Sequence, residues 1–384
     1  MKILFVQFAN SVYKRHSSCD AYWDAFYNRW ENIGYYKGNN SFEIPKWIAE
    51  INYFTPGIEK ELFWCHHDVS EVTNKIQDSL VDYVLFSLMN ANQDYICSIV
   101  CKCPQQKFII GGYNDVYLKK LRREFQNVTI CDTTENVSRI LGREYFFGTN
   151  YSLFKGEKTI PRLTMSYGCL NNCKFCIVPH GKVKSVDEGL IKQQIKSFNE
   201  LNYKLIYIDD KTFGQSANYR TIKSLNPVSS DFNGFIVQTT SGMLIKKAEE
   251  FKSIGVYVAE YGLETYNDSI LKKYRKPSSE RFSDIAIETC NDVGLKLIAN
   301  VIIGLPEETE ETYQRTFDYV MNNLSNGKLI GMNPAIYTDY NNNENLGEID
   351  FMEDRKTELH RKWWDKFNTT ATEILIKQKY NVEE

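Results

Sequence analysis

The fold is decided by a short cysteine-rich stretch, which reads Ser166-Tyr-Gly-Cys-Leu-Asn-Asn-Cys-Lys-Phe-Cys-Ile-Val-Pro-His-Gly181. Its cysteines, Cys169, Cys173 and Cys176, have the spacing CxxxCxxC. Three thiolates on one short loop can hold three irons of a four-iron cluster and leave the fourth iron open to a small molecule. The alternatives are a zinc site with His180 as its fourth ligand, or three cysteines packed in a core.

Strands and helices alternate around this loop, from about residue 151 to residue 340. The candidate strands are Arg162–Ser166, Leu205–Ile208, Gly234–Thr239, Val256–Tyr261, Lys296–Ile303 and Leu329–Tyr337. This alternation is typical of a parallel α/β fold and predicts a partial (β/α)6 barrel. In such a barrel the loops after the strands form the reactive face, and the cysteine loop follows the first strand. Residues 341–384 are predicted to form a polar loop and a last helix, Glu353 to about Lys379.

Residues 1–150 are expected to form a separate Rossmann-like unit with a parallel sheet. Its candidate strands are Ile3–Phe8, Glu61–Trp64, Tyr83–Phe86, Phe108–Ile110 and Val128–Ile130. Helical or irregular stretches separate these short apolar runs, which favours an α/β fold here as well. Residues 10–40 are rich in Tyr, Trp and Asn, but their spacing is neither helical nor alternating. That segment is left without an assignment.

The cysteine loop resembles the signature of the radical S-adenosylmethionine (SAM) superfamily, CxxxCxΦC, in which an aromatic residue precedes the last cysteine. Here that residue is Phe175. The resemblance implies a [4Fe–4S] cluster on Cys169, Cys173 and Cys176, with SAM bound at the open iron. It also implies reductive cleavage of SAM to a deoxyadenosyl radical that abstracts hydrogen, and a flavodoxin- or ferredoxin-like protein as the reductant.

Three further motifs resemble those with which this family binds SAM. Asp209 and Asp210 follow the second barrel strand, where the family places a group that hydrogen-bonds the SAM ammonium, and a carboxylate suits a cationic amine. Glu264, in Gly-Leu-Glu-Thr after the fourth strand, is the candidate contact to ribose or methionine. Ile302 and Gly304 would lie against adenine. Asn300 stands where the family has a glycine, and its side chain is a candidate partner of the ribose or the base.

The first unit resembles the cobalamin-binding domain that precedes many radical SAM barrels. The matching stretches are Val81–Ser87, Lys107–Gly112 and Asn127–Glu135, followed by residues 136–141. A doubly wound sheet binds ligands at the carboxyl ends of its strands, so Ser87, Gly111 and Gly112 are expected to admit a nucleotide tail. The resemblance implies cobalamin as a further cofactor and methylation of an unidentified substrate. The Asp-x-His-x-x-Gly motif of other cobalamin proteins is absent, so an empty domain of the same fold is the alternative.

Methylthiotransferases have very similar barrels and carry an auxiliary cluster on three N-terminal cysteines. Cys19, Cys65 and Cys97 lack the sequence context of that set, but methylthiolation stays an alternative. Cys97 and Cys101 are four residues apart and are expected to pack on the buried face of a helix, near Cys103. A non-catalytic interaction protein that carries zinc or a cluster is the alternative from another class.

Composition and charge indicate which partners and which cellular compartment are expected for this protein. The net charge is −3, so nucleic acid is not a favoured partner, and no apolar run is long enough to cross a membrane. Ten cysteines and no recognisable signal peptide favour the reducing cytoplasm. Lys272, Lys273, Arg275 and Lys276 form a basic run that is expected to be a solvated helix face.

Overall fold

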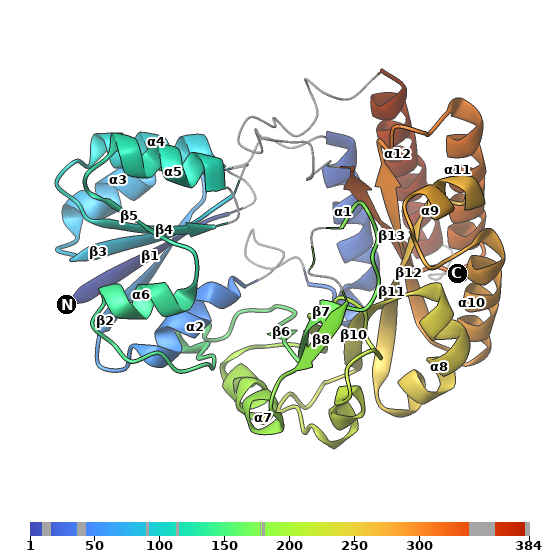
Figure 1. The fold of residues 1–384 in the computed structure, drawn as a ribbon, viewed down its shortest axis with the longest axis horizontal. Helices are drawn as coiled ribbons and strands as arrows, with labels where there is room; N and C mark the ends of the chain where they lie inside the picture. Colours follow the sequence, from blue (N-terminus) through green and yellow to red (C-terminus); the bar gives the residue numbers. More distant parts are fainter. Residues whose placement is uncertain are drawn as a thin grey trace.

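The computed structural model describes residues 1–9, 17–36, 44–89, 92–112, 115–176, 178, 181–337 and 358–380. These residues form two parallel sheets, each packed with helices (Figure 1). This arrangement confirms the predicted fold class: a Rossmann-like unit is followed by a partial α/β barrel and a C-terminal helix. None of the helices in the described ranges is both long and apolar enough to span a membrane.

The first sheet has the strand order β2-β1-β3-β4-β5, with every pair parallel. Its strands are β1 (Lys2–Phe8), β2 (Glu59–Cys65), β3 (Tyr83–Leu88), β4 (Phe108–Gly112) and β5 (Val128–Cys131). Along β1, Ile3 and Phe5 pack in one core, whereas Leu4 and Val6 pack in another, as the two-residue period of a strand requires. The first core contains α2 (Lys46–Phe54) and α6 (Thr134–Ile140), and the second contains α3 (Val69–Asp78), α4 (Gln93–Lys102) and α5 (Asp115–Glu124).

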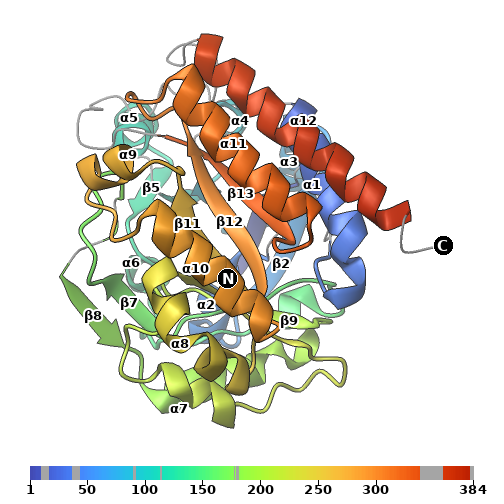
Figure 2. The same cartoon turned by 90° about the vertical axis from the view of Figure 1, so that its right-hand side faces the viewer.

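The second sheet is the partial barrel and has the order β13-β12-β11-β10-β9-β6, again all parallel. Its strands are β6 (Arg162–Leu163), β9 (Leu205–Ile208), β10 (Gly234–Thr239), β11 (Val256–Glu264), β12 (Lys296–Ile303) and β13 (Gly331–Ile336). The helices are α7 (Glu188–Ser197), α8 (Ser241–Ser253), α9 (Asp268–Lys273), α10 (Glu280–Asp292) and α11 (Glu310–Ser325), with short 3-10 helices at Ser152–Phe154, Phe198–Glu200 and Tyr219–Ser224. Figure 2 shows α8, α10 and α11 on the outer face of this sheet.

The predicted first barrel strand is divided in two. Only its start forms β6, and the chain then enters an antiparallel hairpin of β7 (Ser166–Cys169) and β8 (Lys182–Ser185). The hairpin joins the two ends of the cysteine loop, because Cys169 pairs with Lys182. The loop is therefore fastened on both sides.

The helix α1 (Ser17–Trp30), from the segment left without an assignment, packs on the second sheet, and a 3-10 helix (Glu31–Ile33) follows it. The hydroxyl of Tyr22 donates to the carbonyl of Met332 at 2.6 Å and accepts from the Met332 amide at 2.8 Å. The indole N–H of Trp30 donates to the carbonyl of Ile330 at 2.8 Å. Because β13 is the edge of its sheet, these bonds pair backbone groups that no further strand reaches.

The last helix is α12 (Glu358–Tyr380), which lies beside α1 and α11 (Figures 1 and 2). Trp363 and Phe367 are almost fully buried and contact Phe317 of α11. The hydroxyl of Ser18 donates to Asp365 at 2.7 Å and so ties α1 to α12. The polar loop predicted at the start of residues 341–384 and the first residues of the predicted helix lie outside the described residues.

Candidate functional site

The cysteine loop is held by backbone hydrogen bonds at several points. The Gly181 amide donates to the Cys169 carbonyl at 2.8 Å and closes the hairpin. The Lys174 amide donates to the carbonyl of Tyr274 at 2.9 Å, and the Leu170 amide donates to Oε1 of Gln215 at 2.9 Å. Both partners belong to segments that follow barrel strands, so the loop rests on the carboxyl end of the barrel.

The thiols of this loop lie in a largely buried setting. Cys169 and Cys173 are buried and Cys176 is half-buried. Burial raises the pKa of Cys173 to about 11, although the nearby Lys276 charge acts in the opposite direction. Cys169 Sγ has two hydrogen-bonding neighbours: the Asn171 amide donates to it at 3.4 Å, and the Thr212 hydroxyl oxygen shares a hydrogen bond with it at 3.3 Å.

Three thiols on one loop are a donor set that fits an iron–sulfur cluster with one open iron. Among the described residues, no three cysteine, histidine or acidic side chains are grouped closely enough to hold one ion. The thiolates of a cubane cluster bind different irons, so they need to surround the cluster rather than one point. His180, the fourth ligand in the zinc alternative, lies outside the described residues.

Lys276 is a site residue that the sequence analysis missed, and the predicted solvated helix face is wrong for it. The helix α9 ends at Lys273, and Lys276 forms a 2.5 Å ion pair with Glu264 Oε1. The two side chains are only 8% and 11% exposed. Burial alone would lower the pKa of Lys276, but the Glu264 carboxylate outweighs burial and raises it. Pro277 was the available signal, because the residue before a proline rarely continues a helix.

The backbone around Glu264 is shaped to form this pair. Glu264 has φ of 63°, a left-handed conformation that costs a residue with a side chain about 1–3 kcal/mol. The register between β11 and β12 shifts at the same point. A Cβ on Gly262 would overlap both Lys276 Nζ and Glu264 Oε1, so this glycine provides the room for the pair.

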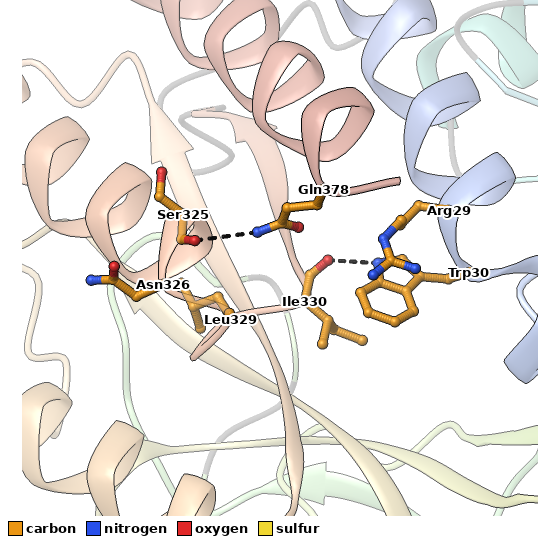
Figure 3. Close-up of a pocket in the computed structure, with 8 residues that line it drawn as sticks. Arg29, Trp30, Ser325, Asn326, Leu329, Ile330 and Gln378 are labelled. Carbon is orange, nitrogen blue, oxygen red and sulfur yellow. Dashed lines mark hydrogen bonds between the residues drawn. The ribbon is translucent and has the colours of Figure 1, made fainter. Parts of the chain in front are cut away.

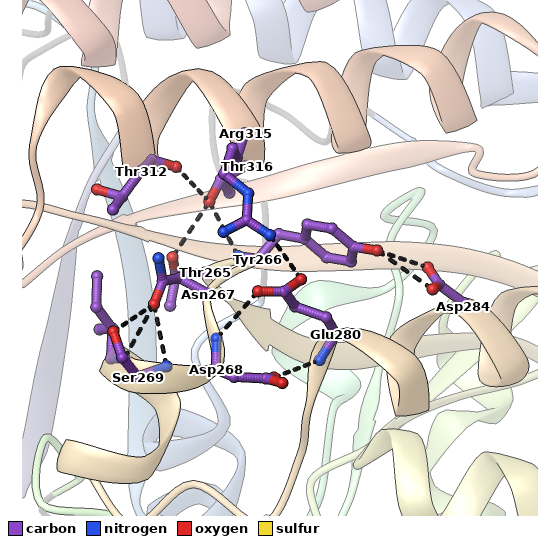
Figure 4. A network of polar contacts seen from close by, with 11 residues as sticks. Thr265, Tyr266, Asn267, Asp268, Ser269, Glu280, Asp284, Thr312, Arg315 and Thr316 are labelled. Atoms are coloured by element: carbon purple, nitrogen blue, oxygen red, sulfur yellow. Dashed lines mark hydrogen bonds and ion pairs between the residues drawn. The ribbon is translucent and has the colours of Figure 1, made fainter.

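A polar network behind the site fixes the segment that carries Glu264 and Lys276 (Figure 4). The Tyr266 amide donates to Thr316 Oγ1 at 2.9 Å, which fastens the end of β11 to α11. Asn267 caps α9 by accepting from two amides, and Glu280 accepts from the Asp268 amide at 3.2 Å. Arg315 forms an ion pair with Glu280 at 2.7 Å.

The paired acids after β9 have different partners. Asp209 forms ion pairs with Arg162 at 3.1 Å and Lys211 at 3.6 Å. Asp210 is fully buried, and its Oδ1 accepts from the Ser166 amide at 2.7 Å. Its Oδ2 is buried with no hydrogen-bond partner in the described part of the chain. Burial raises the pKa of Asp210.

The residues predicted to face adenine lie at the carboxyl end of β12. Ile302 packs with Tyr274 and Leu305, and Phe175 of the cysteine loop lies against this cluster. The Gly304 amide donates to the Tyr313 hydroxyl at 2.8 Å, and Gly304 has φ of 100°. Asn300 pairs in register with Gly262, and its Oδ1 is buried with no partner among the described residues.

Ser87, Gly111 and Gly112 meet at the carboxyl edge of the first sheet. Ser87 is the register partner of Gly111, and Leu88 that of Gly112. A Cβ on Gly112 would overlap the Leu88 carbonyl oxygen, and one on Gly111 would lie 2.9 Å from the Cys131 carbonyl oxygen. The close approach of neighbouring strands therefore requires both glycines whether or not a ligand is bound.

The other predicted cysteine sets do not form a second centre in the described ranges. Cys101 is exposed, so its expected burial is wrong, whereas Cys103 is buried and Cys97 half-buried. Cys19 lies on α1 and Cys65 ends β2, where its thiol donates to the Asp68 carbonyl at 3.1 Å. No three of these residues make up a metal-binding group among the residues described.

A separate cavity of about 300 Å³ lies among the ends of α1, α11 and α12 (Figure 3). Arg29, Trp30, Ile330 and Gln378 are among its lining residues. Ile330 directly precedes β13, so this cavity lies at the amino end of a barrel strand. The cysteine loop, Asp210 and Glu264 lie at the opposite, carboxyl end, which is where we place the candidate site.

Comparison with known families agrees with this location. Residues 163–320, from the end of β6 into α11, match the radical SAM superfamily. This segment, which includes the cysteine loop, is thus similar to radical SAM proteins. The cofactors of that superfamily are a [4Fe–4S] cluster and SAM. An electron donor is a further general requirement of the family.

The chain is also similar to individual curated proteins and to solved structures. A Methanocaldococcus jannaschii protein, provisionally named a methylthiotransferase, is 29% identical over 40% of this chain and 37% of its own length. The chain thus spans well under half the length of that curated relative. Among solved structures, the cobalamin-dependent SAM radical enzyme OxsB has a TM-score of 0.57 at 12% identity, covering 98% of this chain and 56% of OxsB. The radical SAM methyltransferase TsrM of Kitasatospora setae has a TM-score of 0.55 at 11% identity, covering 87% and 74%. These two structures share its fold.

Proposed function

We propose that this protein is a radical SAM enzyme, which cleaves SAM reductively at a [4Fe–4S] cluster held by Cys169, Cys173 and Cys176 in order to abstract hydrogen from its substrate. The observation that carries the proposal is that the three loop cysteines, the partnerless Asp210 oxygen and the Glu264–Lys276 pair all lie at one end of the barrel. The bound cluster and SAM supply the electron transfer and the radical. The chain's own residues position them and exclude water.

Each residue has a role in this proposal. Asp210 would hold the SAM ammonium, because Oδ2 has an unused acceptor while Oδ1 fixes the start of β7. Ile302 and Phe175 would form the apolar wall beside adenine, with the Gly304 backbone next to them. Asn300 would bond the ribose or the base through its partnerless oxygen. Glu264 is engaged by Lys276, so its proposed contact to ribose or methionine would use the oxygen that Lys276 leaves free.

The test is anaerobic reconstitution with iron and sulfide, followed by reduction with dithionite in the presence of SAM. We expect about four irons per chain and slow release of deoxyadenosine without a substrate. Protein that binds zinc instead of iron, or that binds iron but releases no deoxyadenosine from SAM, would contradict the proposal.

We further propose that the first unit holds cobalamin and that the reaction is a cobalamin-dependent methylation. The supporting observations are the shared fold with OxsB and TsrM and the meeting of Ser87, Gly111 and Gly112 at the carboxyl edge of the sheet. Gly112→Phe is unsuitable as a test, because its side chain would collide with β3. Ser87→Tyr adds bulk at the edge itself, and Thr129→Tyr adds it to an exposed position within β5 as the matched control.

Hydroxocobalamin should co-elute with the wild-type protein and with Thr129→Tyr in gel filtration, but not with Ser87→Tyr. Colourless wild-type protein that still cleaves SAM would leave hydrogen abstraction without a methyl carrier as the reaction.

Methylthiolation is the second candidate, and the M. jannaschii relative favours it. It would need an auxiliary cluster, yet Cys19, Cys65 and Cys97 are on three separate elements, α1, β2 and α4. Iron analysis decides between the two reactions, because a second cluster would about double the iron content. We also propose a flavodoxin- or ferredoxin-like electron donor and a reducing, cytoplasmic location, since all ten cysteines are free.

A further inference from the structure

The buried ion pair between Glu264 and Lys276 is difficult to explain by stability alone. Removing two charges from water costs more than their attraction usually returns, and well-packed apolar side chains often replace such a pair without loss. Here the chain also places Glu264 in a left-handed conformation and keeps position 262 free of a side chain to make room. These features indicate that the charges themselves have a use.

The pair is oriented relative to the cysteine loop. Lys276 Nζ lies 5.8 Å from the centre of the Phe175 ring, which is the residue directly before Cys176. Its charge acts on both Cys173 and Cys176, and on Cys173 it acts more strongly than the Glu264 charge does. The ammonium end of the pair is therefore directed toward the thiols, and the carboxylate end belongs to β11.

We propose that the Glu264–Lys276 pair is a fixed dipole whose positive end favours the reduced state of the cluster. The inference rests on the proposed role of the three cysteines. When the cluster accepts one electron its charge becomes one unit more negative, and a buried ammonium nearby offsets that charge with little screening by solvent. Lys276 thus acts through the thiolates as a positioning residue. The negative charge of Glu264 partly cancels the effect of the Lys276 charge on the cluster.

The test is an anaerobic redox titration of the reconstituted cluster, followed by electron paramagnetic resonance without SAM. Lys276→Met should make reduction of the cluster about tenfold less favourable at equilibrium. For a one-electron couple this lowers the midpoint potential by about 59 mV. Glu264→Gln should raise it. Lys276→Arg keeps the charge and should stay near the wild type, as should Lys272→Met, which alters an exposed lysine on α9.

Opposite shifts in the two variants are the signature of a dipole, because general damage to the site would move both in one direction. Shifts in the same direction, or none, at wild-type iron content would overturn the inference while leaving the proposed function intact. Wild-type protein without iron would overturn the proposed function instead. If Lys276→Met does not retain iron, Glu264→Gln decides, since an unchanged or lowered potential there contradicts the dipole.

Discussion

Asp210 holds the first residue of the cysteine hairpin with one carboxylate oxygen and leaves the other without a partner. Its Oδ1 accepts from the Ser166 amide at 2.7 Å, and its Oδ2 is buried and unpaired within the described residues. A buried, unpaired carboxylate oxygen is costly, and in the proposed function the SAM ammonium would be its partner. In the proposed function, the same residue therefore links the position of the loop to the binding of SAM.

Substitution of Asp210 separates these two tasks. Asp210→Asn keeps an acceptor for the Ser166 amide but removes the charge, so we expect normal iron content and SAM affinity weaker by about 1.5–3 kcal/mol. Asp209→Asn is the control, and it should cost less because its carboxylate already has Arg162 and Lys211. Isothermal titration with SAM measures both. Equal losses in the two variants would contradict the assignment to Asp210.

The affinity for SAM should also depend on pH through Asp210. Burial raises the pKa of this carboxyl group, and only its ionised form attracts the SAM ammonium. As the pH falls through the raised pKa, the group takes up a proton and affinity is lost; above that pKa affinity is retained. Titrations across the acidic range should show this loss in the wild type and a flatter profile in Asp210→Asn. Identical profiles would remove Asp210 from the site.

The three loop cysteines should be required for the cluster. Cys169→Ala, Cys173→Ala and Cys176→Ala should each abolish iron binding and deoxyadenosine release, because each leaves one iron without its thiolate. Cys97→Ala is the matched control and should change neither, since Cys97 lies on α4 of the first unit. Partial loss of iron in Cys97→Ala would instead support an auxiliary cluster and methylthiolation.

The contact between α1 and the edge of the barrel should be measurable at one amide. Tyr22→Phe leaves the Met332 amide and carbonyl without their partner, which costs about 1–3 kcal/mol for a buried polar group. Hydrogen exchange at the Met332 amide should accelerate. Tyr257→Phe is the control, because its hydroxyl has no hydrogen bond to the residues described. Unchanged protection in Tyr22→Phe would show that β13 does not depend on α1.

The strands that the sequence predicted best are short, mainly apolar runs. Leu205–Ile208, Gly234–Thr239 and Lys296–Ile303 have the same bounds in the structure. The strand β8 was missed because Lys182–Ser185 is short and mostly exposed, so it has no apolar pattern. The helix α1 was missed because it packs against both β13 and α12, so more than one of its faces is covered.

The candidate site was likewise predicted only in part from the sequence. Spacing alone brought out the three cysteines, because their pattern is local. Lys276 was missed, since its burial depends on an ion pair with a residue on another element and on the missing side chain at position 262. The partners that distinguish Asp210 from Asp209 likewise come from β6 and β7 and cannot be read from two adjacent aspartates.

The bond between Tyr22 and Met332 joins residues that are 310 positions apart in the chain. During translation α1 is synthesised early and β13 near the end. The aromatic face of α1 therefore has no β13 to pack against during most of synthesis. The five strands of the first sheet, by contrast, are all available once Cys131 has been made. Contacts of long sequence separation form late because a long loop must close first. We therefore expect the first sheet to fold during translation and the barrel to be completed only after it.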